Sequence, residues 1–432
     1  MSNSSALSTF LSQSLRTALA AVFVVLCSRW MGPEGRGELG LVLFWAGLLL
    51  KASGYVGGSN LANALQRFSM ASVLPFSIFW AVLIVIAGFG GLCYCFDSSL
   101  AWNVTAISLP LMLLNIQYNL QQGLAMVRQR NRLQLGLEVL KLLLLFLFAS
   151  MMHRGDFEIP CMFDISLDKV VVALALAYGV ILLFSTGLLH HEIGLSFKNK
   201  QKPPRSLFSD GFWSQNGHLA QFLAYRLSLY SLTYLLGNHK AAGIYANALL
   251  IADAIWIFAN SFGTIAHARI LRSKNENFKA DIILRYTIFA LAGTIVACLF
   301  MAILPSAVFV WVFGKGFETL KDTALLLIPA ILAVAASSLF SHYLHAVNRF
   351  KALFVANVCG LVLQTAVGFW LIPRWDIYGA CLAADAGFIL SFILVYAFFK
   401  NQNPQSQLKG KISYRLLLKV CMRFLKVRSA SL

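Results

Sequence analysis

Long uncharged apolar segments recur from one end of this 432-residue chain to the other, and they constrain its fold more than any other feature. A helix of about 20 apolar residues crosses the hydrocarbon core of a bilayer, and helices satisfy their own backbone hydrogen bonds there. The sequence therefore predicts an all-α integral membrane protein with about twelve transmembrane helices. The predicted spans lie near residues 8–30, 39–62, 70–95, 100–126, 133–152, 169–190, 211–236, 241–268, 285–313, 323–346, 352–372 and 377–399.

The net charge of +18 has a distribution that fits membrane topology and argues against a nucleic-acid-binding role. With the N-terminus in the cytoplasm, the predicted inner loops and tail hold most of the 35 Lys and Arg residues, whereas the outer loops hold more acids than bases. This asymmetry is what the positive-inside rule requires. We therefore expect both termini in the cytoplasm, and we exclude a soluble enzyme, a secreted domain and a disordered scaffold.

A polar, basic stretch at residues 191–210 divides the predicted spans into six plus six. The sequence around Gly32 and Gly37 is echoed around Gly237 and Gly243, where one span ends at a glycine and the next begins. We expect a six-helix N-terminal lobe (1–196), a linker (197–210), a six-helix C-terminal lobe (211–400) and a basic tail (401–432), with a central cavity between the lobes. In the tail, basic residues recur every four positions, which predicts an interfacial amphipathic helix, with a disordered tail as the alternative.

Ionisable residues within membrane spans are costly and are candidates for function. Lys51 is the clearest candidate, because no acid lies near it along the chain. An anion bound in a water-filled cavity would compensate its positive charge. The other intramembrane ionisable residues have structural explanations. Glu138 and Lys141 can pair on one helical face, and Arg226 and Asp253 can form a salt bridge. Arg16 can snorkel to the inner interface, Arg29 is a candidate interfacial anchor, and Asp385 lies within the last span.

Uncharged polar residues gather in the fourth and seventh spans. They suit either hydrogen bonds between helices or contacts with sugar hydroxyls, and both interpretations stay open. We interpret His218 as a hydrogen-bonded polar residue. No nucleotide-binding, hydrolase, zinc or calcium motif is present, so we expect neither an enzyme nor a cofactor. The glycan-facing candidates are Asn115, Asn119, Gln122, Gln215, Asn216 and Tyr225.

Two segments carry a family resemblance. LCSRWMGPEGRGELGLVLFWAGLLL, followed by GYVGGSNLANALQR, resembles the opening of the oligosaccharidyl-lipid flippases, the Wzx-type O-antigen and polysaccharide translocases. YRLSLYSLTYLLGNHKAAGIYANALLIADAIWIF resembles their second-half signature. This family belongs to the superfamily that also contains the MATE multidrug exporters and the lipid II flippase, so the resemblance implies a MATE-like fold. Family members often carry an acid shortly after the arginine of span seven, and here Leu227, Ser228 and Leu229 follow, which leaves a carboxylate role to Asp253.

The resemblance implies a flippase that moves an undecaprenyl-diphosphate-linked oligosaccharide from the inner to the outer leaflet of the bacterial inner membrane. We assign the diphosphate to Lys51, Arg226, Arg29 and Arg16, because cations bind phosphate oxygens. Asp253 or Asp385 would carry a coupling proton. The expected partners are the lipid-linked substrate, membrane lipids, a polysaccharide polymerase and a chain-length regulator.

Two alternatives remain. A MATE-like antiporter exporting cationic drugs would need a carboxylate in the first spans, and the interiors of spans one to four contain none. A membrane-bound polymerase or ligase would need a large outer loop, and the longest one predicted here spans only residues 153–168.

Overall fold

The computed structural model describes residues 3–58, 61, 65, 70–124, 126–150, 165–193, 206–272, 275–347 and 349–402, and the regular elements within these segments are all helices. The predicted tail helix, the outer loop at 153–164 and the first part of the linker lie outside these residues. The helices are α1 (Asn3–Gly57), α3 (Met70–Cys95), α4 (Ser98–Gly123), α5 (Val127–Ser150), α6 (Leu167–Ile193), α7 (Ser206–Leu236), α8 (His239–Arg272), α9 (Glu276–Ile303), α10 (Ser306–Phe313), α11 (Leu320–Leu326), α12 (Ile328–Ala346) and α13 (Phe350–Gln402).

The helices match the predicted spans closely, and the all-α membrane fold is confirmed. By length and composition, 8 of the described helices are suited to cross a membrane, or 9 if a bent pair within α8 counts as one span. Two of the eight, α1 and α13, each contain two predicted spans joined at a kink. Helix α7 has 31 residues, but its first half is polar and it is not among the eight.

Two predicted spans, 285–313 and 323–346, are each broken into a long and a short helix. Helix α9 ends at Ile303, and α10 begins after Pro305. Because proline disfavours helical backbone at the preceding residue, Leu304 leaves the helix with φ −61° and ψ 133°. The predicted span over 285–313 was therefore too long, and its last residues form a separate 8-residue helix.

The kinks in α1 and α13 and the turn before α8 lie at residues with unusual backbone angles. Gly32 and Gly237 have φ values of +67° and +61°, which glycine adopts readily, so the predicted glycine turns are confirmed. Asp376 bends α13 at φ +49°, and Asn238 donates a hydrogen bond of 2.8 Å to its Oδ2 atom. We call the end of the molecule that carries these bends the kinked end.

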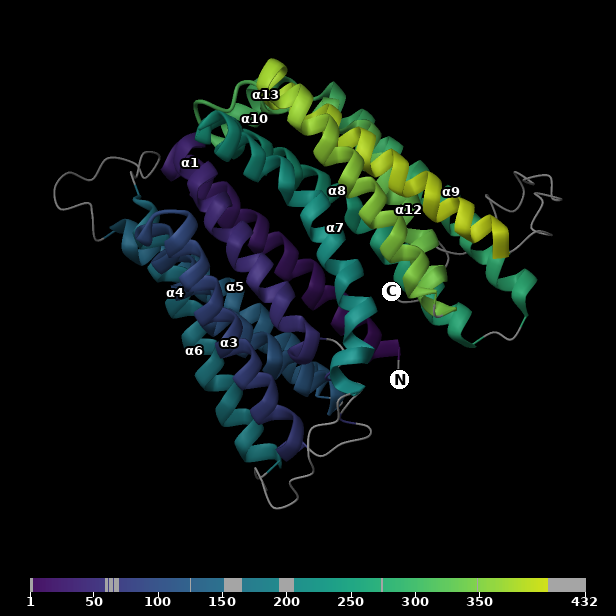
Figure 1. The fold of residues 1–432 in the computed structure, drawn as a ribbon, viewed down its shortest axis with the longest axis horizontal. Coiled ribbons are helices and arrows are strands. Elements are labelled where there is room, and N and C mark those ends of the chain that lie inside the picture. The colour runs from purple at the N-terminus through teal and green to yellow at the C-terminus, as the bar shows by residue number, and fades with distance from the viewer. Residues whose placement is uncertain are drawn as a thin grey trace.

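The buried side chains form separate clusters in the two halves of the chain. Two clusters draw their buried members from the chain up to α6, and two draw theirs from α7 onward. In Figure 1, α3 to α6 lie on one side and α8, α9, α12 and α13 on the other, with α1 and α7 between them. The molecule therefore has two helical lobes that meet along α1, α7 and α8. The exact lobe boundaries stay a prediction, although the end of the predicted linker, residues 206–210, belongs to α7.

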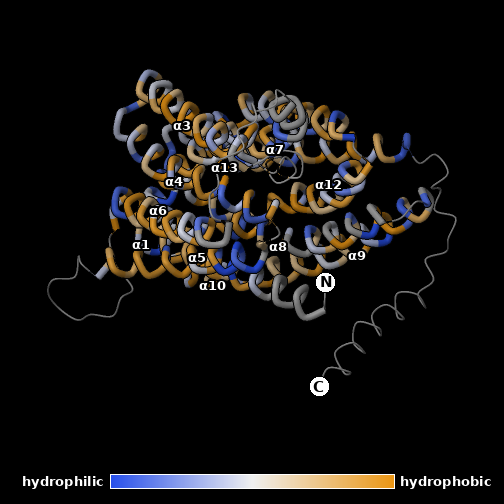
Figure 2. The backbone as a smooth tube through the Cα atoms, turned by 90° about the horizontal axis from the view of Figure 1, so that it is seen from below, coloured by the Kyte–Doolittle hydropathy of each residue, from blue (hydrophilic) through white to orange (hydrophobic). Residues whose placement is uncertain are grey.

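The outer surface of the helices is apolar, as a lipid-facing surface must be. Large hydrophobic side chains such as Phe79, Leu183 and Val296 are 62%, 73% and 66% exposed. Figure 2 shows that apolar residues dominate the helices in both lobes. Exposed tryptophan and tyrosine residues gather near the kinked end, where an aromatic belt would meet the lipid headgroups: Tyr94, Trp102, Tyr234, Trp311, Trp370 and Trp375.

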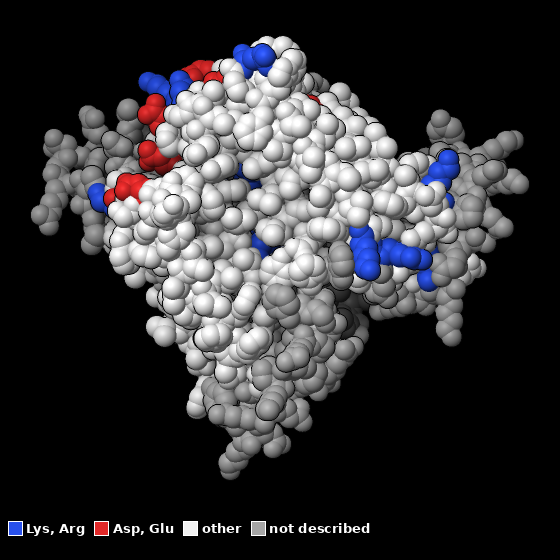
Figure 3. Space-filling view, in the orientation of Figure 1, with Lys and Arg blue, Asp and Glu red and all other residues white. Residues whose placement is uncertain are grey.

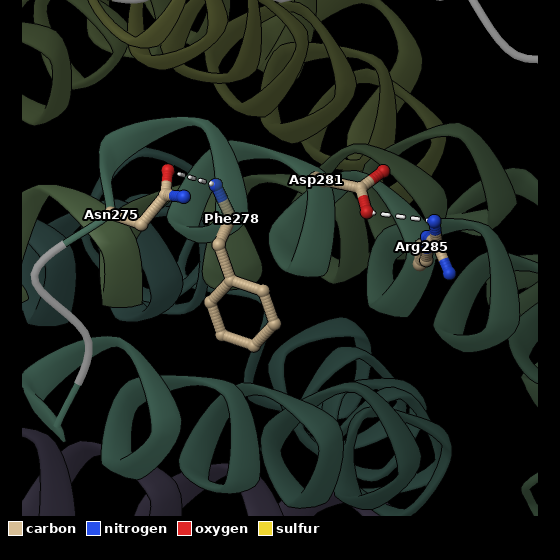
Figure 4. Close-up of polar contacts among 4 residues, drawn as sticks. All are labelled: Asn275, Phe278, Asp281 and Arg285. Atoms are coloured by element: carbon tan, nitrogen blue, oxygen red, sulfur yellow. Dashed lines mark hydrogen bonds and ion pairs between the residues drawn. The ribbon is translucent and has the colours of Figure 1, made fainter.

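Charges lie mainly at the helix ends. Figure 3 shows acidic side chains, with several basic ones among them, at the upper left of the molecule, and basic side chains at its right edge. Near that basic edge, Asn275 caps α9 by accepting a hydrogen bond of 3.2 Å from the Phe278 N–H, and Arg285 pairs with Asp281 at 2.8 Å (Figure 4). This polar end of α9 agrees with a helix that leaves the bilayer there.

Candidate functional site

The two lobes touch most closely at the kinked end, where two glycines cross. A side chain at Gly37 would collide with the carbonyl oxygen of His239, and one at Gly243 would collide with that of Pro33. The added Cβ atoms would also lie 3.1 Å from the Gly243 nitrogen and 3.0 Å from the Gly37 nitrogen, respectively. These are the second glycines of the sequence echo, so the two related segments pack against each other across the lobe interface.

A buried polar network supports this crossing. Asn247 of α8 donates a hydrogen bond of 2.9 Å to Ser28 Oγ, and Arg36 Nε donates one of 3.1 Å to Asn247 Oδ1. All three side chains are at least 95% buried. Sequence reasoning gave Arg36 no role, because its partner lies 211 positions away. The structure shows that Arg36 ties α1 to α8.

A second contact between the lobes lies near the far end of α1. Gln215 of α7 donates a hydrogen bond of 2.7 Å to the Lys51 carbonyl oxygen. Tyr55 donates its hydroxyl hydrogen to Asn216. At Gly54, an added Cβ would lie 2.5 Å from Gln215 Nε2, so this glycine permits the approach. Gln215 and Asn216, both predicted to face a glycan, thus link the lobes in this conformation.

The Lys51 side chain has the environment expected from the sequence. It is half-buried, and none of the ion pairs found among the described residues includes it. Its charge acts on His218, on the neighbouring helix α7. Lys51 is therefore a half-buried cation at the lobe interface that no described carboxylate neutralises.

The Arg226 side chain is only loosely paired. Its Nη2 atom lies 3.9 Å from Asp253 Oδ2, at the outer limit of an ion pair, and the two side chains are 35% and 50% exposed. The predicted salt bridge is thus present but long. Arg226 also repels the guanidinium of Arg36, so positive charge gathers at the lobe interface between α1 and α7.

The other predicted diphosphate residues lie elsewhere. Arg16 donates a hydrogen bond of 2.6 Å to Gln134 on α5, within the N-terminal lobe. Arg29 lies at the kinked end, where its Cα atom approaches Gly314 in the connection between α10 and α11. The structure therefore does not bring Arg16 and Arg29 to one place with Lys51.

Three predicted residues have structural contacts. Glu138 and Lys141 form the expected pair at 2.6 Å, and both side chains are 10% exposed. Lys141 also lies over the rings of Phe23 and Tyr178, at 5.6 and 5.9 Å from their centroids. Asp385 accepts a hydrogen bond of 2.8 Å from the Ala330 N–H, near the start of α12. Its role as a coupling residue stays a prediction.

Several of the predicted glycan-facing residues bond to neighbouring helices. Asn119 donates a hydrogen bond of 3.0 Å to the Gly57 carbonyl oxygen on α1 and another of 3.0 Å to the Asn115 carbonyl oxygen on its own helix, and Gln122 accepts one from Arg130 on α5. Tyr225 packs against Trp256 and Phe388, with ring centroids 4.8 and 4.9 Å apart. The interhelical interpretation therefore accounts for these contacts, and a glycan role stays a prediction.

The sequence matches no protein-family model and no curated protein. Solved structures, however, share its fold. An inward-facing multidrug resistance MATE family transporter of the MOP superfamily superposes with a TM-score of 0.71 at 13% identity, covering 92% of this chain and 100% of that one. The lipid II flippase MurJ, in an inward closed conformation, superposes with a TM-score of 0.65 at 11% identity, covering 91% and 87%.

A third similar structure is a MOP superfamily transporter from Pyrococcus furiosus, with a TM-score of 0.58 at 12% identity, covering 91% of this chain and 93% of that one. The report on that protein describes a binding pocket of reversed polarity that suggests a different function. Together these structures show that the chain has a MATE-like membrane fold. Identities of 11–13% show the fold alone.

Proposed function

We propose that this protein is a transporter of the MOP superfamily that flips an undecaprenyl-diphosphate-linked oligosaccharide across the bacterial inner membrane for O-antigen or surface polysaccharide synthesis. Both termini would face the cytoplasm, in agreement with the basic inner loops. A lipid-linked glycan with a diphosphate needs cations along its path and polar groups beside them, while its polyprenyl tail remains in lipid.

The observation that carries the proposal is the half-buried Lys51 at the lobe interface, with no described acid paired to it. A cation in low-dielectric surroundings gains most from an anionic ligand. Arg226, whose contact with Asp253 is long and exposed, adds a second cation that a diphosphate would compete for. The likeness to a lipid II flippase shows that this fold accommodates a lipid-linked substrate in that protein.

The test uses purified protein in proteoliposomes with a fluorescent undecaprenyl-diphosphate oligosaccharide, and measures its exchange between leaflets. We expect Lys51→Ala and Arg226→Ala each to slow the exchange about tenfold or more, because a charge-assisted hydrogen bond contributes roughly 1.5–3 kcal/mol. The control is Arg285→Ala, which removes a cation whose side chain is 54% exposed on α9, and it should leave the exchange unchanged.

Full activity in the single and double Lys51 and Arg226 variants would overturn the cation assignment. The competing function is a MATE-like exporter of cationic drugs, because a multidrug transporter shares the fold. A cationic drug needs a carboxylate, and the predicted spans one to four, residues 8–30, 39–62, 70–95 and 100–126, contain neither aspartate nor glutamate. Efflux of an organic cation without exchange of the lipid would establish that alternative.

A further inference from the structure

The C-terminal lobe contains a polar cavity whose described lining residues all belong to that lobe. It has a volume of about 220 Å³ and is bounded by α7, α8, α12 and α13. Its walls carry imidazole, amide and hydroxyl groups, and none of the described lining residues is an aspartate, glutamate, lysine or arginine. The polar lining includes His218, His342, His345, Asn260, Asn357 and three serines of α12.

The imidazoles in and beside this cavity lie close together although they come from three helices. The ring of His218 stacks on that of His345, with centroids 6.1 Å apart and an interplanar angle of 14°. The rings of His267 and His342 lie 5.8 Å apart. His342 and His345 are three positions apart on α12, so they share one face of that helix.

One hydrogen bond indicates the tautomer of an imidazole beside the cavity. Nδ1 of His267 lies 3.0 Å from the backbone carbonyl oxygen of His342. Because a carbonyl oxygen only accepts hydrogen bonds, His267 donates its Nδ1–H there, and its Nε2 atom is left to accept a hydrogen bond or bind a proton. The electrostatic interactions of His345 extend to His218, His342 and His267, so a proton on one ring affects the others.

We propose that this cavity is a proton-binding site in which His218, His342 and His345 take up and release the proton that drives transport. Histidine is the side chain that ordinarily titrates near neutral pH, and hydroxyl and amide groups around it can hold the water molecules that carry protons. The coupling role rests on the proposed function. The site is distinct from Asp253, which lies by Arg226, and from Asp385, which holds the start of α12.

The surroundings connect the cavity to the lobe interface. From α1, the charge of Lys51 acts on His218, and this is the cation that the proposed function assigns to the diphosphate.

Several of the other titratable groups on the packed helices have contacts of their own, and two lie beside a residue that lines the cavity. Tyr225 lines the cavity and packs on Trp256. On α8, Arg269 lies over the ring of Tyr286, at 5.6 Å from its centroid. Asp253, Asp385 and Arg226 are held by the contacts already described, and Tyr343 is buried on α12. Near the start of α13, Arg349 and Lys351 flank Phe350, which lines the cavity.

The transport test compares the wild-type protein with a combined His218→Gln, His342→Gln and His345→Gln variant in proteoliposomes. In the wild type, we expect a pH gradient to accelerate leaflet exchange of the lipid-linked oligosaccharide. In the variant, we expect this acceleration to be lost while exchange without a gradient remains. The control is His190→Gln, an exposed histidine on α6 of the other lobe, which should keep the acceleration. Undiminished acceleration in the combined variant would overturn the proposal.

A second measurement does not depend on transport. In detergent-solubilised full-length protein with isotope-labelled histidine, the cavity imidazoles should take up protons in coupled steps as the pH is lowered, followed by NMR. His345→Gln alone, which keeps most of the cavity wall, should shift the midpoints of the remaining cavity rings, and His190→Gln should not. Cavity rings that titrate independently of one another would overturn the proton site. A wild type that exchanges no lipid but shows this titration would instead overturn the proposed function.

Discussion

Two ion pairs show how strongly burial decides the effect of a charge. Glu138 and Lys141 lie in the membrane part of α5 with side chains 10% exposed, whereas Asp281 and Arg285 on α9 are both 54% exposed (Figure 4). We expect Glu138→Gln to leave Lys141 as an uncompensated buried charge and to destabilise the fold by about 3–5 kcal/mol. The midpoint of thermal unfolding in detergent measures this effect.

Asp281→Asn is the matched control, because it breaks a pair within one helix, at i,i+4 spacing, whose side chains are 54% exposed. Its cost should stay below about 1 kcal/mol. Equal shifts in the unfolding midpoint for the two variants would show that the Glu138–Lys141 pair is not desolvated, and would contradict the structural interpretation of this pair.

The sequence predicted a contact between residues that are close together in the chain, but it did not predict contacts between residues that are far apart in the chain. The Glu138–Lys141 pair follows from helical spacing alone, and it was predicted. The bond from Arg36 to Asn247 joins two lobes, and no local pattern signals it. The spacing of His342 and His345 in the sequence places both on one face of a helix, but it does not indicate that His218, from another helix, packs beside them.

At the scale of elements, the crossing of α1 and α8 requires glycine at positions 37 and 243, because neither position has room for a side chain. Gly37→Ala and Gly243→Ala should each destabilise the lobe contact by about 1–3 kcal/mol, because the added methyl groups meet backbone carbonyl groups that cannot move aside. The double variant should cost less than the sum, since separating the helices relieves both collisions at once. Thermal unfolding of the purified protein measures all three.

Gly179→Ala on α6 is the control for this series. An added Cβ there meets nothing within 4 Å, and alanine favours helix over glycine. Its stability should therefore equal or exceed that of the wild type. Strictly additive effects of Gly37→Ala and Gly243→Ala would indicate that the two glycines do not share one contact.

The kinks illustrate a second limit at the scale of elements. The bend at Gly32 was predicted, because one span ends at Gly32 and the next begins shortly after it, as also happens at Gly237. The sequence predicted a break between the last two spans, but it did not predict that Asp376, a non-glycine residue with φ +49°, would form the bend. Asp376 keeps this conformation while it accepts a bond from Asn238 of the α7–α8 turn, which only tertiary contacts bring there.

At the scale of the whole molecule, the lobe contact at the kinked end has to open if the lobes rock during transport. Ser28 and Asn247 touch across it. We expect the pair Ser28→Cys and Asn247→Cys, joined as a disulfide by an added oxidising reagent, to stop leaflet exchange because the lobes can no longer separate there. Reducing the disulfide should restore exchange in proteoliposomes.

Each single cysteine variant, treated with the same reagent, is the control and should retain exchange. The six cysteines among the described residues are separate thiols, and three of them, Cys27, Cys298 and Cys381, are buried. Replacing the exposed Cys93 and Cys95, together with Cys161, Cys359 and Cys421, beforehand limits the reaction to the intended pair. Undiminished exchange in the crosslinked protein would mean that this contact stays closed throughout transport.

The sequence by itself determined the membrane environment, the helical class and nearly all the span positions, because these follow from the hydrophobic length that a bilayer demands. It also identified Lys51 as a cation without a local partner. Only the tertiary structure decided which lobe surfaces meet, that Arg36 bridges them, and that His218, His342 and His345 share one cavity. Those features arise from contacts between helices far apart in the chain, and hydrophobic periodicity carries no information about which helices pack together.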